Sequence, residues 1–410
     1  MIRAQGAAMH ESRSMQHSEG PAAVLAIATA NPSGTILSQD EFADQFFRIA
    51  KSDQLIGLKE KLKKICHKTG IEKRHFHLNE EILRAHPEFL DRALPSLDAR
   101  IDIVATEVPK LAESASVKAI AEWGRPATDI THLVFSTYSG YRAPSADLRL
   151  ASLLGLRTSV CRTILSLHGC YGGARALHLA KELAENNRGA RVLVACSEIT
   201  LVCFTGPDGS NLVGHALFGD GAGAVIVGAG PLAAGERPVF EMVSATQTTI
   251  PETEYALGMQ VSEGGLDFHL AIQVPMLLGQ NVEQCLRDAF RSAAALVGDD
   301  DDGDVEVTWN DLFWAVHPGG RPILDKIEDV LQLEPGKLEA SRQVLREYGN
   351  MSGATIVFVL DELRRRRRRR REEEGDHDHQ LPELGVMMAF GPGITIETMV
   401  LRIPSDPKGN

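Results

Sequence analysis

Two stretches of this chain, 180 positions apart, repeat one plan of strand, turn and helix. An apolar strand over 131–137 ends in a glycine-containing turn, and a second apolar strand ends at His317 before another such turn. Cys170 and Asn350 each stand in a turn that opens a helix, and they are separated by the same 180 positions as Thr137 and His317. Equal spacings of this kind predict a duplicated unit. Because strands alternate with helices in each copy, we expect an α/β fold with a mostly parallel sheet covered by helices on both faces.

The turn at Cys170 has the features of a reactive thiol. It lies in the sequence Gly-Cys-Tyr-Gly-Gly, between an apolar strand over 163–167, which we expect to be buried, and an amphipathic helix that ends near Asn187. The free N–H groups and the positive dipole at a helix N-terminus favour a thiolate. A small buried cysteine that packs behind a helix is the alternative. Since the carboxyl ends of strands carry the sites of such sheets, we expect Cys170, His317 and Asn350 to converge.

Composition argues against several classes of function. The formal net charge of −12 argues against a general role at nucleic acids or membrane surfaces, and no apolar run is long enough to span a membrane. The six cysteines lack the paired spacings of a disulfide framework or a zinc site, so we expect reduced thiols, no bound metal and a cytoplasmic protein. Residues 1–20 lack the apolar segment of a signal peptide, and we expect a disordered tail there.

Arg364–Arg371 is a run of eight arginines followed by acidic residues. Blocks of like charge are usually solvated and disordered, so we expect a surface insertion over 364–380. A patch that binds nucleic acid or an anionic membrane is the alternative, and the neighbouring acidic residues disfavour it because they nearly neutralise the run.

Shorter patterns give local predictions. Ser38 and Glu41 are spaced as a capping box that opens a helix. The glycine-rich segment 218–228 runs into a strand and has no Lys-Ser/Thr pair, so we interpret it as a hairpin rather than a phosphate loop. The segment 385–397 predicts a second hairpin around a Gly-Pro-Gly turn.

One face of a helix predicted over 54–68 carries a row of three lysines, Lys61, Lys64 and Lys68. Three ammonium groups in a row could hold the phosphates of a nucleotide-bearing substrate. An ordinary solvated lysine face is the alternative.

A thiol, an imidazole and a carboxamide in this order permit two kinds of acyl transfer. In the first, His317 activates Cys170, which takes an acyl group from a thioester. Asn350 and His317 then donate N–H groups to the carbonyl of a second thioester and stabilise the enolate formed when a malonyl group loses CO2. This chemistry needs no metal or organic cofactor. The second kind is a cysteine protease, which predicts disulfides and a secretory segment and leaves the duplicated sheet unexplained.

The motifs together resemble plant type III polyketide synthases of the chalcone synthase superfamily. The resemblance is carried by Cys170 in Gly-Cys-Tyr-Gly-Gly, His317 in His-Pro-Gly-Gly, Asn350 in Tyr-Gly-Asn-Met-Ser, Phe218-Gly-Asp-Gly and the terminal Phe-Gly-Pro-Gly. It covers nearly all of residues 21–403. It implies a thiolase-like fold with layers α-β-α-β-α, an N-terminal half over 21–243 that carries the cysteine, and a C-terminal half over 244–405 that carries the histidine and the asparagine.

The resemblance also implies roles for individual residues. Cys170, His317 and Asn350 match the family's catalytic triad, and Phe218 and Phe268 match its two gatekeeper phenylalanines between the CoA tunnel and the cavity. The family's basic positions at the CoA entrance, where arginine is usual at the middle one, fall on Lys61, Lys64 and Lys68. We therefore expect a homodimer that uses acyl-CoA and malonyl-CoA and binds no nucleic acid.

Substrate specificity is where this chain departs from chalcone synthases. The positions that line the family's substrate pocket are Tyr138, Ser139, Ala143, Thr200, Cys203, Met259 and Ser352. Tyr138 and Met259 are larger than the residues usual there and should narrow the pocket for a flat aromatic ring, whereas Cys203 makes its wall less polar. A flexible methionine can move aside along an alkyl chain. The pattern resembles plant alkylresorcinol synthases, which implies a long-chain fatty acyl-CoA starter, three malonyl-CoA extensions and aldol closure to a 5-alkylresorcinol.

Two alternatives stay open. If the pocket substitutions are neutral, the chain is a chalcone-, stilbene- or curcuminoid-type synthase with a phenylpropanoyl-CoA starter. A non-catalytic protein that binds acyl-CoA is the alternative from another class.

Overall fold

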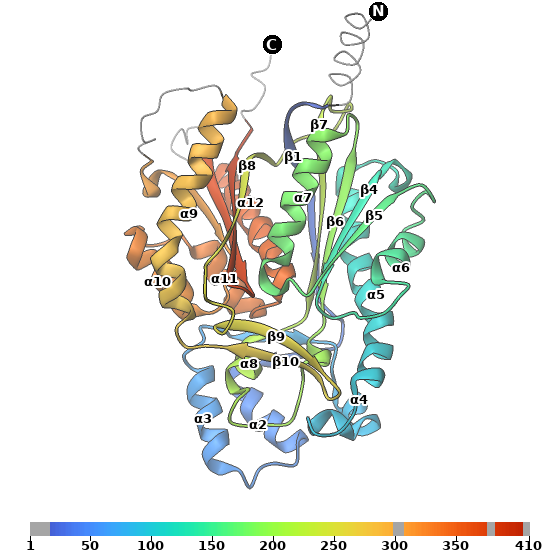
Figure 1. Ribbon diagram of the computed structural model, residues 1–410, viewed down its shortest axis with the longest axis vertical. Helices are drawn as coiled ribbons and strands as arrows, with labels where there is room; N and C mark the ends of the chain where they lie inside the picture. The colour runs from blue at the N-terminus through green and yellow to red at the C-terminus, as the bar shows by residue number, and fades with distance from the viewer. Residues whose placement is uncertain (1–16, 298–306, 375–381, 405–410) are drawn as a thin grey trace, which may run out of the picture.

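A computed structural model describes residues 17–297, 307–374 and 382–404 of the chain. Its largest element is a nine-stranded sheet with the order β11-β12-β13-β8-β1-β7-β6-β4-β5 (Figure 1). The strands are β1 (Glu19–Ala30), β4 (His132–Thr137), β5 (Cys161–Ser166), β6 (Arg191–Glu198), β7 (Gly221–Gly230), β8 (Phe240–Thr249), β11 (Phe313–Val316), β12 (Leu384–Gly391) and β13 (Thr395–Arg402).

The strand order confirms the duplicated unit. Read outward from the centre, β1-β7-β6-β4 in one half matches β8-β13-β12-β11 in the other. The outermost of these pairs, β4–β6 and β11–β12, are both parallel, and the pairs nearer the centre are antiparallel in both halves. Within the nine-stranded sheet as the structure describes it, only β5 has no counterpart in the second half. The repeated spacing in the sequence therefore reflects a repeated architecture.

The prediction of a mostly parallel sheet is wrong. Three of the eight strand pairings are parallel and five are antiparallel. The reason is the way the last two strands of each unit, β6–β7 and β12–β13, are connected. They are joined without a long crossover helix, and only antiparallel strands can be joined in this way. The two halves also meet through the antiparallel pair β1–β8.

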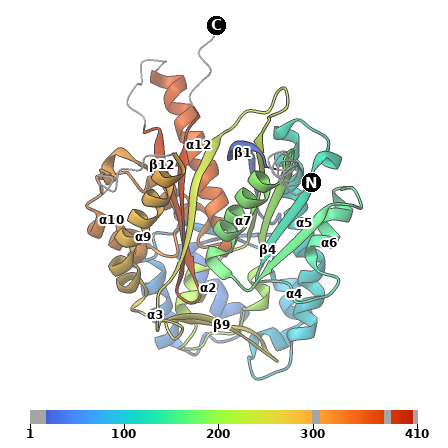
Figure 2. The same ribbon diagram turned by 45° about the horizontal axis from the view of Figure 1, so that its top comes forward.

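Helices separate the two halves of the sheet and cover their outer faces (Figures 1 and 2). Two helices, α7 (Gly172–Asn186) and α12 (Thr355–Glu374), pack in a central core between the halves. The outer face of the N-terminal half is covered by α5 (Leu97–Trp123), and that of the C-terminal half by α9 (Val274–Val297) and α10 (Arg321–Leu331). The layers are therefore α-β-α-β-α, as the resemblance implied.

In the sequence, the central strands are continuous apolar runs because both of their faces are buried. Along β6, Val192 and Val194 pack in the central core, while Leu193 and Ala195 pack in the outer core beneath α5. Among the described helices, none is both long and apolar enough to cross a membrane.

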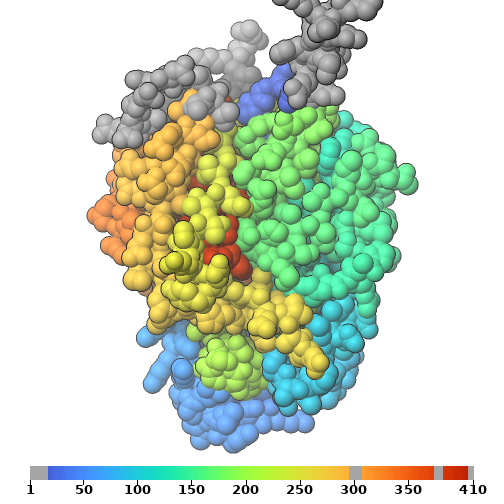
Figure 3. Space-filling view, viewed as in Figure 1, coloured from blue at the N-terminus to red at the C-terminus, as the bar shows by residue number. Residues whose placement is uncertain are grey.

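A smaller assembly caps one end of the layers, at the bottom of Figure 1 and in blue, cyan, yellow-green and gold in the lower part of Figure 3. Its members are β2 (Thr35–Ser38), α2 (Gln39–Ile49), α3 (Ile56–Cys66), β3 (Lys73–Phe76), α4 (Glu80–Ala85), α8 (Leu212–Leu217), β9 (Leu257–Ser262) and β10 (Gly265–Leu270). The chain is completed by α6 (Ala146–Leu153), α11 (Glu339–Tyr348) and the short 3₁₀ helices η1 (Pro87–Leu90), η2 (Ala127–Asp129), η3 (Gly169–Tyr171), η4 (Thr200–Val202), η5 (Trp309–Asp311) and η6 (Ser352–Ala354).

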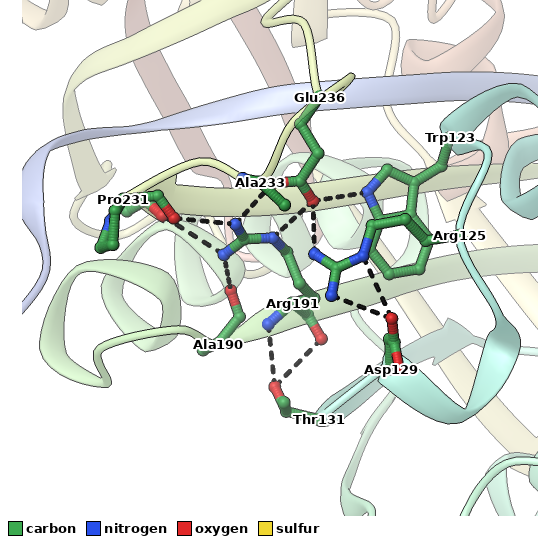
Figure 4. Close-up of polar contacts among 10 residues, drawn as sticks. Trp123, Arg125, Asp129, Thr131, Ala190, Arg191, Pro231, Ala233 and Glu236 are labelled. Carbon is green, nitrogen blue, oxygen red and sulfur yellow. Dashed lines mark hydrogen bonds and ion pairs between the residues drawn. The ribbon is translucent and has the colours of Figure 1, made fainter.

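The connection from β7 to β8 is fixed by a buried carboxylate, Glu236 (Figure 4). Glu236 accepts hydrogen bonds from Arg191 Nη2 at 2.6 Å, Arg125 Nη1 at 3.0 Å and Trp123 Nε1 at 2.8 Å. Burial acts to raise the pKa of Glu236, but the hydrogen bonds from Arg191 and from its other donors outweigh burial and lower the pKa to about 2. The polar cluster therefore ties this connection to the ends of α5 and β6.

Three local predictions about the backbone and burial are corrected. Residues 1–16 of the expected tail lie outside the described residues, and Glu19 and Gly20 already belong to β1. The capping box does not form, because α2 begins after Ser38 without a hydrogen bond from its side chain. The strand β5 is exposed rather than buried, since it forms the edge of the sheet.

The segment 218–228 is not a hairpin. Phe218 ends α8, and residues 221–230 form one strand that pairs with β1 on one side and β6 on the other. The glycines allow close packing here rather than a turn: a Cβ on Gly223 would lie 2.5 Å from Val357 of the central helix α12. The second predicted hairpin, β12–β13, is confirmed.

The arginine run is helical and not a disordered insertion as far as the structure describes it. The helix α12 continues to Glu374, and residues 375–380 of the predicted insertion lie outside the described residues. Carboxylates one turn away neutralise the guanidinium groups: Arg366 pairs with Glu362 at 2.7 Å and Arg368 with Glu372 at 2.8 Å. Pairs at i and i+4 stabilise a helix that like charges alone would disfavour.

Candidate active site

The thiol, the imidazole and the carboxamide come together at the carboxyl ends of the strands. Cys170 lies in η3 before α7, His317 follows β11, and Asn350 precedes η6. Asn350 Nδ2 lies 3.7 Å from Cys170 Sγ and donates to the Gly319 carbonyl, two residues after His317, at 3.2 Å. The amide is oriented by the Ser352 N–H, which donates to Asn350 Oδ1 at 2.8 Å.

Two glycines allow the Cys170 and Asn350 turns to approach. A Cβ on Gly173, at the start of α7, would lie 2.0 Å from the Gly353 carbonyl oxygen in η6. A Cβ on Gly353 would in turn lie 3.1 Å from the Gly173 nitrogen. No side chain fits at so short a distance, so the duplicated units meet through glycine in both copies.

Burial dominates the electrostatics of the thiol and the imidazole. Burial raises the pKa of Cys170 to about 11, against the opposing hydrogen bonds of Ser352 and Asn350. Burial also lowers the pKa of His317 to about 3. These shifts favour a neutral thiol and a neutral imidazole, so burial opposes the thiolate expected from the helix N-terminus.

His317 carries hydrogen-bonding capacity that the described residues do not use. Its side chain is fully buried and packs edge-on against Phe390, with 5.4 Å between ring centroids. Neither ring nitrogen has a hydrogen-bond partner in the described part of the chain. Buried polar groups without partners are rare, so the two ring nitrogens are available to a ligand. The Asn350 amide donates to the carbonyl of Gly319, two residues after His317, so the two side chains come from neighbouring segments.

The two predicted gatekeepers, Phe218 and Phe268, stack on each other with 4.8 Å between ring centroids. Phe218 forms a backbone bridge with Asn350, so one side of the gate is anchored to the carboxamide. Phe268 lies in β10 opposite Met259 of β9 and packs against the ring of Tyr138 at 5.8 Å. The gate is therefore held by elements from both halves and from the cap.

A cavity of about 320 Å³ lies in the cap, with both gatekeepers in its wall. Its lining is mainly apolar and includes Phe42, Phe46, Phe76, Leu83 and Phe204. Thr200 and Cys203 also line it, as predicted for the substrate pocket, but the three residues of the triad do not. The structure thus shows a mainly apolar chamber that has the phenylalanine pair in its wall and does not include the nucleophile.

The remaining predicted pocket residues surround the triad, with one exception. Tyr138, Ser139 and Ser352 are buried, and Met259 Cε lies 3.1 Å from the position of a Cβ on Gly169, beside the nucleophile. Ala143 is exposed and does not line the cavity of its own chain. The resemblance places this position in the cavity of a partner copy, which a single chain does not test.

The three predicted lysines are exposed at α3 and just beyond its end. No ion pair is formed by Lys61, Lys64 or Lys68 within the described residues, whereas Lys59 and Lys63 of the same helix pair with Asp44. Three ammonium groups therefore remain free for an anionic ligand.

Sequence reasoning missed Glu198, a buried carboxyl group at the end of β6. Its Oε2 accepts hydrogen bonds from Thr137 Oγ1 at 3.1 Å, the Tyr138 N–H at 3.0 Å and Ser139 Oγ at 3.0 Å. Burial raises the pKa of Glu198 to about 8. The signal was a single acidic residue at the end of an otherwise apolar strand.

Comparisons with known proteins agree with this architecture. Residues 9–231 match the family "Chalcone and stilbene synthases, N-terminal domain", and residues 241–404 match "Chalcone and stilbene synthases, C-terminal domain". The chain is 56% identical over 398 residues to a bisdemethoxycurcumin synthase from Oryza sativa subsp. japonica, covering 96% of each protein. Enzymes of this family use CoA thioesters. The chain is therefore a member of the chalcone and stilbene synthase family and a type III polyketide synthase.

Proposed function

We propose that Cys170 is the acyl-carrying nucleophile and that His317 and Asn350 perform the condensation. The thiol proton passes to His317 as the sulfur attacks the carbonyl of an acyl-CoA, and the CoA thiolate leaves and is protonated. Malonyl-CoA then loses CO2, and the electron pair of the broken bond forms an enolate. The enolate carbon attacks the acyl carbonyl, a carbon–carbon bond forms and the Cys170 thiolate is released.

The geometry of the two donors supports this division of roles. Asn350 has one amide hydrogen directed at Gly319, which leaves the other near the sulfur. His317, neutral because burial lowers its pKa, offers an N–H that no described residue accepts. Two neutral N–H donors that share one oxygen can stabilise a developing enolate without a metal or an organic cofactor.

The starter that we propose is a long-chain fatty acyl-CoA, and the product a 5-alkylresorcinol formed by three malonyl-CoA extensions and aldol closure. The observation that carries this proposal is the mainly apolar cavity beside the gatekeepers. Each methylene group buried there contributes about 0.8 kcal/mol. The flexible Met259 next to the Cys170 turn can move along an alkyl chain, as a branched side chain could not.

A curcuminoid-type reaction on a phenylpropanoyl-CoA starter is the second candidate. The 56% identity to a bisdemethoxycurcumin synthase favours it. An assay that separates the two supplies malonyl-CoA with either hexadecanoyl-CoA or 4-coumaroyl-CoA and identifies the products by mass spectrometry. A higher kcat/KM for the fatty acyl ester and an alkylresorcinol product support the first proposal, and preferred turnover of the coumaroyl ester replaces it with the second.

The same assay, with Cys170→Ala beside the wild type, addresses a non-catalytic acyl-CoA-binding role. We expect a covalent acyl group on Cys170 in the wild type and none in the variant. Binding of acyl-CoA without acylation or product would support the non-catalytic alternative.

We further propose a cytoplasmic homodimer. The exposed edge strand β5 supports the dimer, because an unpaired strand edge is a site for pairing with a second copy. Leu167, which follows this strand, is 41% exposed. Light scattering after gel filtration should give twice the chain mass of 44.6 kDa, and a monomer mass would contradict the dimer. The six free cysteines fit a reducing compartment.

A further inference from the structure

The cavity in the cap contains a histidine that the proposed chemistry does not use. His215 belongs to α8 and lines the cavity three residues before the gatekeeper Phe218. Its ring lies between two aromatic walls of the cavity, with centroid distances of 4.7 Å to Phe46 and 5.8 Å to Phe204. Aromatic packing on both sides fixes the ring, so its nitrogens occupy defined positions in an otherwise mainly apolar chamber.

Other polar side chains of the lining already have partners within the chain. Thr200 Oγ1 donates to Asp220 at 2.7 Å, and Arg92 Nη2 donates to the Cys203 carbonyl at 2.9 Å. Apart from Thr35, the remaining polar side chains of the lining likewise make hydrogen bonds within the described chain. The cavity therefore has few polar groups left for a ligand.

His215 differs from these side chains. Its Nε2 is buried and has no hydrogen-bond partner among the described residues. Arg92 Nε of the same lining also has no hydrogen-bond partner there, but it lies 3.0 Å from Asp267 Oδ1 in an ion pair. Burial lowers the pKa of His215 to about 4, so the ring is neutral at pH 7 and has one donor and one acceptor. A buried polar atom without a partner in a ligand-sized cavity indicates a ligand group that completes the hydrogen bond.

We propose that His215 determines starter specificity by hydrogen-bonding a hydroxyl group remote from the thioester of the acyl chain. The inference rests on the proposed function, because it requires the acyl group to enter this cavity. Cys170 does not line the cavity, whereas His215 and both gatekeepers do, so only atoms several bonds from the thioester reach His215. A hydroxyl group suits a neutral imidazole because it both donates and accepts.

Such a hydroxyl occurs at the end of an ω-hydroxylated fatty acyl chain or on the ring of a 4-hydroxyphenylpropanoyl group. The test compares kcat/KM within two matched starter pairs, 16-hydroxyhexadecanoyl-CoA against hexadecanoyl-CoA and 4-coumaroyl-CoA against cinnamoyl-CoA. We expect the wild type to prefer the hydroxylated member of at least one pair by about three- to tenfold, the range of one neutral hydrogen bond. The pair that shows the preference identifies the source of the hydroxyl.

Three variants separate the hydrogen bond from packing. His215→Phe keeps an aromatic ring and should reduce the preference to a ratio near one, whereas His215→Gln keeps a donor and an acceptor and should retain part of it. His75→Phe changes a half-buried histidine that does not line the cavity and should leave the ratio unchanged. Thermal melting checks that each variant is folded.

The outcomes distinguish a failure of the role of His215 from a failure of the proposed function. Equal kcat/KM within both pairs, or a preference that His215→Phe leaves intact, would overturn the role of His215 while polyketide formation stands. Absence of polyketide from every starter would instead overturn the proposed function.

Discussion

Arg74 donates a 2.7 Å hydrogen bond from Nη1 to the main-chain carbonyl of Phe218, so a buried cation holds the backbone of a gatekeeper. The same nitrogen donates to the His215 carbonyl at 2.7 Å, and Nε donates to Gln39 Oε1 at 2.9 Å. The guanidinium group also lies 4.2 Å from the ring centroid of Phe42, which lines the cavity. One side chain thus joins the gate, the cavity wall and α2.

We predict that Arg74→Met loosens this gate. Two carbonyl oxygens and one amide oxygen lose a donor, and each unsatisfied buried group costs about 1–3 kcal/mol. The melting temperature should fall, and KM for malonyl-CoA should rise by about tenfold. The share of products released before the last extension should also rise. Arg74→Lys keeps a cation with fewer directed donors. Its melting temperature and its KM for malonyl-CoA should lie between those of Arg74→Met and the wild type. A lower melting temperature with unchanged KM and products would mean that Arg74 stabilises the fold without positioning the gate.

Gly173→Ala should separate the two turns that form the site. The new methyl group would lie 2.0 Å from the Gly353 oxygen, so α7 or η6 must shift. A displacement of about 1 Å at reacting groups can lower the rate about a hundredfold, and we expect a loss of that order in kcat. Gly57→Ala, in α3 with open space around it, is the matched control and should keep full activity. Wild-type kcat in Gly173→Ala would show that the contact is not needed.

The parts of the fold that follow from local periodicity and from equal spacing were predictable from the sequence. The duplicated unit and the convergence of Cys170, His317 and Asn350 follow from strands that end at corresponding places in two copies of one unit. Strand direction was not predictable in this way, because the connection from β6 to β7 holds only the short helices η4 and α8 and no long crossover helix. Whether two strands are parallel depends on the connection, which local periodicity does not report.

Other features of the site depend on contacts between distant segments. Glu198 was missed because a single acidic residue at a strand end becomes informative only when Thr137, at the end of β4, and Ser139, just after it, donate to it. The arginine run was misjudged because its guanidinium groups pair with carboxylates, both one turn away, as at Glu362, and far away in the chain, as at Glu122 of α5. The cavity was not predictable for the same reason, because its wall combines side chains of the cap with the two gatekeeper phenylalanines.

Glu236→Gln should destabilise the protein without changing the chemistry of the site. The neutral side chain leaves the cations of Arg191 and Arg125 without their shared counter-charge, and breaking a buried pair costs about 3–5 kcal/mol. Thermal melting at pH 7 measures the loss. Glu241→Gln, which removes a partly exposed pair with Arg402, is the control and should cost no more than about 1 kcal/mol.

The same carboxylate predicts a pH dependence. Its folded-state pKa of about 2 lies below the ordinary value of 4.5, so it stabilises the fold fully above pH 4.5 and loses this effect as the pH falls toward 2. Glu236→Gln lacks that dependence. The difference in melting temperature between wild type and variant should therefore shrink between pH 4.5 and pH 2, and a difference that stays constant over this range would contradict the assignment.

Met259→Gly should widen the pocket next to the nucleophile and change starter choice. The Met259 methyl group lies 3.1 Å from the position of a Cβ on Gly169, and the residue pairs in register with the gatekeeper Phe268. Removing the side chain opens space beside Cys170 and also removes the flexible surface that an alkyl chain can contact. The ratio of kcat/KM for 4-coumaroyl-CoA to that for hexadecanoyl-CoA should rise by about tenfold, because a bulky planar starter gains room and the alkyl chain loses a contact. A change of this size fits one or two methylene-sized contacts, which correspond to about 1–3 kcal/mol. Met259→Leu keeps most of the volume and should change the ratio little. If Met259→Gly leaves the starter profile unchanged, this methionine does not select the starter.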